Sequence, residues 1–442
     1  MQTASTDPLE HKSRKQRGKN REQKYNFRIA LLQGILIRIS FAFASGTTVL
    51  STFIYTLTKN NVLVGLTGSI MTAGWMWPQL LMSNVLEHRP RKLPFYILGM
   101  SGRTIGWMGI VLSTILIGAR NHNLLAFNFL LFYFLAASSM GVSTIPYMDI
   151  ISKAIEPQRR AWFFSLRQCI GLFFQFFIGL FFVEYILSDE SGVVFPYNYT
   201  VLFGCTWVAV IGAFLAFVFI REPIRPVQSE RRPISQHLKV GPHFLKTDIH
   251  YRRFMLFRIF GHFVGMAQPF YAPYAIQRFS VPESTVGLFD ATLAIAGLVS
   301  NLVWGVVGRR YGTIWILRIT AALFCVPSFI AIAAGFLPQA VQVPCYFLVF
   351  SVAGITMSGS MVGFMTYLLN IAPSMSRATY IGFMNTVLLP VSFVPVLGGA
   401  LVPLIHYEGI FAISVGMGIL AYFITMQLEE VIRSDDDVDT KP

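Results

Sequence analysis

The longest polar interruption in this sequence is REPIRPVQSERRPISQHLKVGPHFLKTDIHYRR, residues 221–253. Its prolines and its many charged residues are typical of a linker between two packed units. Apolar segments of similar length lie on both sides of it, and we count six before residue 221 and six after residue 253. The position of this stretch therefore predicts a chain of two similar halves.

Each apolar segment is long enough to cross a lipid bilayer. A helix needs about 20 apolar residues to span a hydrocarbon core about 30 Å thick. Backbone groups inside lipid must be hydrogen-bonded within the protein, and the segments lack the alternation of barrel strands, so we expect helices. The twelve predicted helices cover residues 30–57, 63–86, 93–118, 124–151, 161–187, 198–220, 254–277, 284–307, 313–336, 341–371, 378–404 and 408–428.

The composition agrees with a membrane protein. Hydrophobic residues make up 54% of the 442 residues and charged residues only 13%, whereas soluble domains are about a quarter charged. We find no zinc-hydrolase, serine-hydrolase, P-loop or dinucleotide motif, so the sequence predicts neither an enzyme nor an ATP-driven pump, and no cofactor or metal site. The four cysteines form no C-x-x-C pair, which favours isolated apolar positions over metal ligands.

The distribution of lysine and arginine predicts the orientation of the chain. The tails and the loops on their side of the membrane hold 26 of these residues, and the opposite loops hold three, Lys59, Arg120 and Arg278. Positive residues remain on the cytoplasmic side, so we expect both termini in the cytoplasm. The net charge of +14 then faces anionic lipid headgroups rather than nucleic acid.

These observations divide the chain into five parts. We expect a basic tail over residues 1–28, an N-terminal bundle over 29–220, the linker over 221–253, a C-terminal bundle over 254–428 and an acidic tail over 429–442.

The two predicted bundles repeat one another. Val64-Gly65-Leu66 recurs as Val286-Gly287-Leu288, and LIRISF (36–41) recurs as LFRIFG (256–261). RRAWFFSLRQ (159–168) parallels SRATYIGFMN (376–385). Matches in the same order indicate two parallel six-helix units with a space between them near the membrane midplane.

Two loops carry a family resemblance. SNVLEHRPRK (83–92) follows the second predicted helix, and GVVGRRYG (305–312) follows the eighth. Both resemble the G-x-x-x-D-R-x-G-R-[RK] signature of the major facilitator superfamily, although Ser83, His88 and Pro90 depart from it and the second copy lacks the acid. The resemblance covers about residues 28–428 and is closest to poorly characterised bacterial permeases, which implies a bacterial inner membrane. It implies an all-α membrane protein with twelve transmembrane helices in two pseudo-symmetric six-helix bundles.

In that family the signature residues hold the two halves together on the cytoplasmic side. The resemblance therefore implies a cytoplasmic latch made of Glu87, Arg91, Lys92, Arg309 and Arg310. Ordinary charge anchors at the membrane surface are the alternative interpretation.

Several polar residues lie inside predicted helices, where they are costly and therefore candidates for function. Arg38 and Arg258 lie on helices 1 and 7, which line the central path in the family. Two guanidinium groups facing one another suit a carboxylate or phosphate, so we expect an anionic substrate. The candidate substrate-binding residues are Arg38, Arg258, His262, Gln168, Asn385 and Tyr271.

Helices 7 and 8 supply two further predictions. Pro269 and Pro273 should kink the outer part of helix 7. Asp290 lies about two turns into helix 8, and burial there would favour the neutral form of its carboxyl group. Asp290 is therefore the candidate for proton coupling.

The sequence thus predicts a secondary transporter that moves a small organic solute, with anionic character preferred, by alternating access. The expected partners are that solute and membrane lipids, and the expected assembly is a monomer. One alternative is a non-transporting assembly factor or a lipid- or pigment-handling protein on the same fold. The other is multidrug efflux, which would favour acids and aromatic residues over arginines in the central path.

Overall fold

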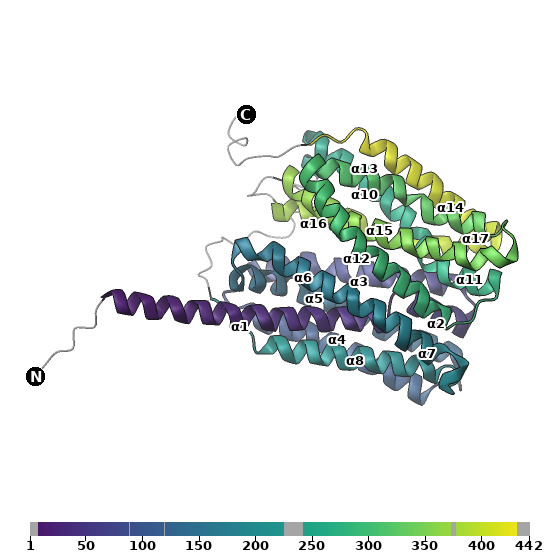
Figure 1. The fold of residues 1–442 in the computed structure, drawn as a ribbon, viewed down its shortest axis with the longest axis horizontal. Helices are drawn as coiled ribbons and strands as arrows, with labels where there is room; N and C mark the ends of the chain where they lie inside the picture. Colours follow the sequence, from purple (N-terminus) through teal and green to yellow (C-terminus); the bar gives the residue numbers. More distant parts are fainter. Residues whose placement is uncertain (1–7, 88, 119, 225–241, 373–376, 431–442) are drawn as a thin grey trace, which may run out of the picture.

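The computed structural model of the protein describes residues 8–87, 89–118, 120–224, 242–372 and 377–430, and these residues form helices, turns and loops with no strand. Figure 1 shows two groups of helices lying along the same direction, α1–α8 and α10–α17. We call the end of the bundle where α8 finishes and α10 begins the linker end, and the opposite end the far end.

The N-terminal half contains the predicted first six passes. Its helices are α1 (Pro8–Phe43), α2 (Val49–Thr58), α3 (Asn61–Glu87), α4 (Leu93–Leu116), α5 (His122–Ala154), α6 (Pro157–Phe177), the π-helical segment η1 (Ile178–Val183), α7 (Glu184–Leu187), the short 3-10 turn η2 (Asp189–Ser191) and α8 (Tyr197–Val218).

The C-terminal half repeats this order. Its helices are α10 (Ile249–Val264), the 3-10 segment η3 (Gly265–Phe270), α11 (Tyr271–Phe279), α12 (Thr285–Tyr311), α13 (Thr313–Phe324), α14 (Val326–Ala334), α15 (Gln339–Ile371), α16 (Arg377–Val391) and α17 (Val394–Thr425). In the linker, residues 242–247 are helical, whereas 225–241 lie outside the described residues.

All twelve predicted passes are present. Nine described segments are long and apolar enough to cross a membrane, and one of them, Tyr380–Thr425, contains two passes because the chain reverses at His406, whose φ is 58°. The two remaining passes are α3 and the interrupted α10–η3–α11. The predicted integral membrane architecture is confirmed.

Two passes are broken where the residues disfavour a regular helix. The predicted kink of the seventh pass lies at η3, which contains Pro269, because proline lacks the N–H that the helix requires. The first pass is interrupted between Phe43 and Val49, a break that we did not predict. Ser45, Gly46 and Thr48 lie in this gap and are weak helix formers.

Aromatic side chains fill the interior of each half, and large apolar side chains also cover the outside. Phe53, fully buried, lies 5.1 Å from the rings of Phe129, Tyr199 and Phe203. Phe336 is 85% exposed. A soluble protein does not leave so many large apolar side chains on its surface, so this exterior fits a lipid environment.

Candidate functional site

The two halves meet closely at the far end. A Cβ atom on Gly65 of α3 would lie 2.1 Å from the backbone oxygen of Pro395 on α17. A Cβ atom on Gly287 of α12 would lie 2.5 Å from the backbone oxygen of Gly179. Only glycine permits such close backbone contact, so these two glycines, which the internal repeat already paired, let the halves close on each other.

Asp290 lies in this interface. It is fully buried, and its carboxylate accepts hydrogen bonds from Thr48 Oγ1 at 3.1 Å and from Gln175 Nε2 at 3.0 Å. Asp290 belongs to the C-terminal half and both donors belong to the N-terminal half. The break in the first pass presents Thr48 to the carboxylate.

Three more hydrogen bonds join the halves nearer the far-end surface. Glu283 accepts from Thr56 Oγ1 at 2.6 Å and from the Tyr199 hydroxyl at 3.0 Å. Tyr407 donates to Asn61 Oδ1 at 2.6 Å. These contacts, like those of Asp290, would all have to break for the far end to open.

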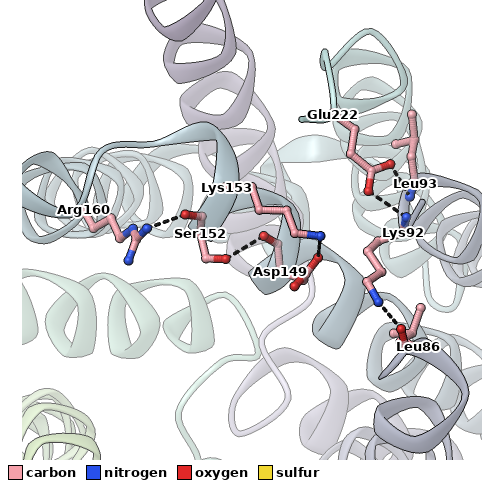
Figure 2. Close-up of polar contacts among 8 residues, drawn as sticks. All are labelled: Leu86, Lys92, Leu93, Asp149, Ser152, Lys153, Arg160 and Glu222. Carbon is pink, nitrogen blue, oxygen red and sulfur yellow. Dashed lines mark hydrogen bonds and ion pairs between the residues drawn. The ribbon is translucent and has the colours of Figure 1, made fainter. Parts of the chain in front are cut away.

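At the linker end, the described contacts stay within one half. Figure 2 shows Glu222 accepting from the backbone nitrogens of Lys92 at 2.7 Å and Leu93 at 3.0 Å, at the start of α4. Glu430 accepts in the same way from the backbone nitrogens of Thr313 at 3.1 Å and Ile314 at 2.9 Å, at the start of α13. In each half, therefore, a carboxylate that follows the sixth membrane pass caps the start of the helix that forms the third pass.

Three of the predicted latch residues, Lys92, Arg309 and Arg310, make described contacts with their own half at the linker end. Lys92 Nζ donates to the backbone oxygen of Leu86 (Figure 2). Arg309 Nε donates to the backbone oxygen of Gly305 at 3.3 Å, and the Arg310 guanidinium lies over the Tyr311 ring.

Two further latch residues lie on the N-terminal side. Arg91 is exposed and lines a surface pocket of about 410 Å³ with Glu222. Glu87 ends α3, and its side chain lies outside the described residues.

Arg38 lies beside a second arginine of its own half. Its Nη2 donates to Gln168 Oε1, and its stem crosses Gly171, where a Cβ would lie 2.5 Å from Arg38 Cγ. Arg167 crosses Gly34 in the same way, at 2.3 Å from its Cδ, and donates to the Tyr147 hydroxyl at 3.0 Å. The two arginines thus lie between α1 and α6 with neutral partners only among these contacts.

The prediction that Arg38 and Arg258 face one another stays a prediction, because the described contacts of each arginine lie within its own half. Arg258 lies over the Phe364 ring at 4.1 Å, and its Nε is buried without a hydrogen-bond partner. His262 Nδ1 lies 2.9 Å from the backbone oxygen of Arg258. Residue spacing predicts how deep each arginine lies in the membrane, but not the direction in which its side chain leaves the helix.

The remaining candidates lie apart from this cluster. Tyr271 is buried in the core of the C-terminal half, where its hydroxyl lies 2.8 Å from Ser328 Oγ and its backbone oxygen accepts from Tyr346. It therefore packs within its own half rather than between the halves. Asn385 is half-buried on α16.

Several residues of these sites were missing from our sequence predictions. Glu222 and Glu430 stand at equivalent places after the last helix of each half, and this equivalence was a usable signal. Thr48 and Glu283 carried no signal, because their partners lie 242 and 227 residues away along the chain.

Within the described ranges, no group of three or more histidine, cysteine, aspartate or glutamate side chains is placed to hold a metal ion. The polar chemistry of the described part is instead that of guanidinium groups near the middle of the bundle and carboxylates between the halves and at the helix starts.

Comparison with known proteins gives matches to one family and to solved structures. The family model described as Major Facilitator Superfamily matches residues 254–437. No curated protein sequence matches the chain. A mutant of the nucleoside transporter NupG has a TM-score of 0.70 and 12% identity, covering 92% of this chain and 100% of that chain. A D-xylose–proton symporter has a TM-score of 0.70 and 16% identity, covering 93% and 98%.

A bacterial homologue of the iron transporter ferroportin matches in two states. Its inward-facing structure has a TM-score of 0.67 and its outward-facing structure 0.62, each with 14% identity over 91% of this chain and 98% of that chain. These likenesses show a shared fold. The C-terminal half therefore matches the Major Facilitator Superfamily model, and the chain as a whole shares the fold of these transporters.

Proposed function

We propose that this protein is a secondary transporter that carries a small organic solute, preferably an anion, by alternating access between its two halves. The observation that carries the anionic preference is the pair Arg38 and Arg167. Both lie within membrane-spanning helices, and their described partners, Gln168 and Tyr147, are neutral. Positive charge inside a membrane-spanning segment without a carboxylate partner is costly, and a bound anion would offset this cost.

The contacts between the halves support alternating access. The halves are joined by glycine contacts and hydrogen bonds at the far end, while the described linker-end bonds stay within each half. We propose that the linker end is cytoplasmic, because the positive residues gather there. The structure then represents an inward-facing state, a view supported by the higher TM-score to the inward-facing ferroportin homologue.

We assign proton coupling to Asp290. Its carboxylate belongs to one half and its donors, Thr48 and Gln175, to the other. When the far end opens, these hydrogen bonds are lost and the carboxylate meets water, where it can exchange a proton. The charge state of this group would therefore change together with the conformation, which is what coupling requires.

The linker-end cations complete the proposed cycle. When this end closes, Arg91 and Lys92 would approach the opposite half, and Arg309 and Arg310 would do the same from the other side. Glu87 would supply the carboxylate of this latch. We assign these five residues to the outward-facing state, in which the linker end is shut.

Transport in proteoliposomes tests the proposal. The purified protein should move radiolabelled carboxylates or phosphate esters, and Arg38→Ala should lower the rate at least tenfold because one charge-assisted hydrogen-bond partner of the anion is lost. Arg120→Ala, at an exposed arginine in a far-end loop, is the matched control and should keep the full rate.

Two outcomes would contradict the proposal. Movement of cations or neutral solutes with equal rates in wild type and Arg38→Ala would remove the anionic preference. A folded, monodisperse protein that moves no solute but binds a partner protein would favour the non-transporting alternative.

A further inference from the structure

Three methionines form an exposed stripe on α15. Met357, Met361 and Met365 are spaced four residues apart, so they share one helix face. They are 61%, 64% and 47% exposed, although they lie in the middle and the linker-end part of a 33-residue helix.

The neighbours of α15 show which way the stripe points. Gly359 and Gly363 pack against α13, where a Cβ would lie 2.4 Å from Thr320 and 2.8 Å from Leu317. The Trp304 ring of α12 also reaches Gly359, at 2.6 Å from its Cβ position. These two glycines lie on roughly the opposite side of the helix from Met361. The stripe therefore points away from α13, and the substantial contacts of α13 are all within the C-terminal half.

The far-end part of the same face points in the same direction and is covered. There Phe350 stacks on Phe289 of α12 at 4.3 Å, and Gly354 packs against Leu293 of α12. The helix α12 also packs against α6 of the N-terminal half. The methionine face thus turns toward the other half, between α10 and α12, rather than toward lipid.

A guanidinium group lies next to the stripe. Phe364 is three residues after Met361 on α15, and the Arg258 guanidinium carbon lies 4.1 Å from the centre of its ring. The Arg258 Nε is buried without a hydrogen-bond partner. An apolar, polarisable surface and an unsatisfied cationic group are therefore side by side.

The N-terminal half carries the same arrangement. Met140 and Met148 on α5 match Met357 and Met365 at an offset of 217 residues (357 − 140 and 365 − 148), and Tyr147 matches Phe364 (364 − 147). Met148 is 47% exposed, and the Arg167 guanidinium lies 5.4 Å from the Tyr147 ring centre. Each half thus places methionines beside an arginine held on an aromatic ring.

We infer that the transported anion is amphiphilic, with a carboxylate or phosphate head and an apolar or aromatic body. Flexible thioethers adapt to apolar shapes, and guanidinium forks bind the head. A soft metal cation is the other ligand that thioethers suit, but Arg258 and Arg167 beside the methionines would repel it. This inference rests on the proposed function, because it names the substrate class of the same path.

Binding of 2-naphthoate to the full-length protein in nanodiscs tests the inference. Met361→Ala should weaken this binding about fivefold, because apolar contact equivalent to about one buried methylene group is lost. The same substitution should not change how well acetate competes with 2-naphthoate for the site. Met361→Leu should keep binding within about twofold. Leu348→Ala is the matched control, because Leu348 is 51% exposed on the opposite face of α15 and should have no effect.

Cysteine labelling tests the direction of the stripe independently. In a background without Cys169, Cys205, Cys325 and Cys345, Met361→Cys should react with a membrane-impermeant maleimide, and 2-naphthoate should slow this reaction. Leu348→Cys should stay unreactive. Equal reactivity of the two cysteines, or reaction at Leu348→Cys alone, would overturn the inference.

The competing ligands separate this inference from the proposed function. If acetate binds as tightly as 2-naphthoate and both need Arg38, anion transport stands and the amphiphile inference fails. If 2-naphthylmethylamine binds and no anion does, both fail. Tight binding of Cu(I) that is lost in Met361→Ala, without binding of 2-naphthoate, would replace the amphiphile by a soft metal ion.

Discussion

Gly65→Ala should shift the protein away from the state described here. The new Cβ would lie 2.1 Å from the Pro395 oxygen, whereas real Cβ atoms essentially never approach closer than 3.0 Å. Because the opposing atom is backbone, no side chain can rotate away. The halves must therefore separate by about 1 Å at the far end, which breaks the close packing between α3 and α17.

The magnitude follows from the cost of overpacking. Inserting a methyl group into a well-packed interface costs about 1–3 kcal/mol. This cost applies only to the state in which the far end is closed, since the two helices separate when it opens. A cost of about 2 kcal/mol changes the ratio of the two states about 30-fold, enough to make a minor outward-facing state the major one.

Double electron–electron resonance measures this ratio directly. Spin labels at Leu124 and Phe336, exposed far-end positions on opposite halves, would be attached in a background free of native cysteines. Gly65→Ala should increase the population with the longer distance. Gly204→Ala is the matched control, since no atom lies within 4 Å of its new Cβ.

Two results would refute the reasoning. If Gly65→Ala gives the distance distribution of Gly204→Ala, the far-end contact does not limit the closed state. If Gly65→Ala lowers the thermal stability without changing the distances, the glycine serves folding alone and not the balance between states.

Four other substitutions probe the remaining contacts. Glu222→Gln should lower the free energy of unfolding by about 1 kcal/mol, because a carboxylate at a helix start is replaced by a neutral acceptor. Glu430→Gln should have the same effect for the same reason. Thermal unfolding in detergent measures both changes. Asp290→Asn should keep solute counterflow but abolish uptake driven by a proton gradient, measured in the same proteoliposomes, and loss of both activities would argue against a coupling role. Gly34→Ala should displace Arg167, whose Cδ would lie 2.3 Å from the new Cβ, and lower anion affinity at least fivefold in a binding assay.

The apolar runs were sufficient to predict the twelve passes, because lipid restricts the backbone to helices of a minimum length. The prolines of the seventh pass also predicted its interruption at η3. The break at Ser45–Thr48 was missed, since weak helix formers are often tolerated inside helices when tertiary contacts compensate. Here the break exposes Thr48 to Asp290, a contact that no local pattern encodes.

The candidate site was less accessible to sequence reasoning. Residue spacing predicts how deep Arg38 and Arg258 lie along their helices, but the direction of each side chain depends on which helices pack together. The reciprocal contacts of Arg38 with Gly171 and of Arg167 with Gly34 determine this direction. The repeat of Gly65 as Gly287 was visible, but its meaning as a pair of interface contacts required the packed structure.

The far-end interface combines close packing with modest polar energy, and this combination suits a protein that must open. Each hydrogen bond at Asp290, Glu283 and Tyr407 contributes about 0.5–1.5 kcal/mol net, because water replaces the partner after opening. The glycine contacts at Gly65 and Gly287 add packing that ends as soon as the helices separate. The closed state is therefore favoured by only a few kcal/mol, and a substrate that binds the arginines differently in the two states can reverse the preference.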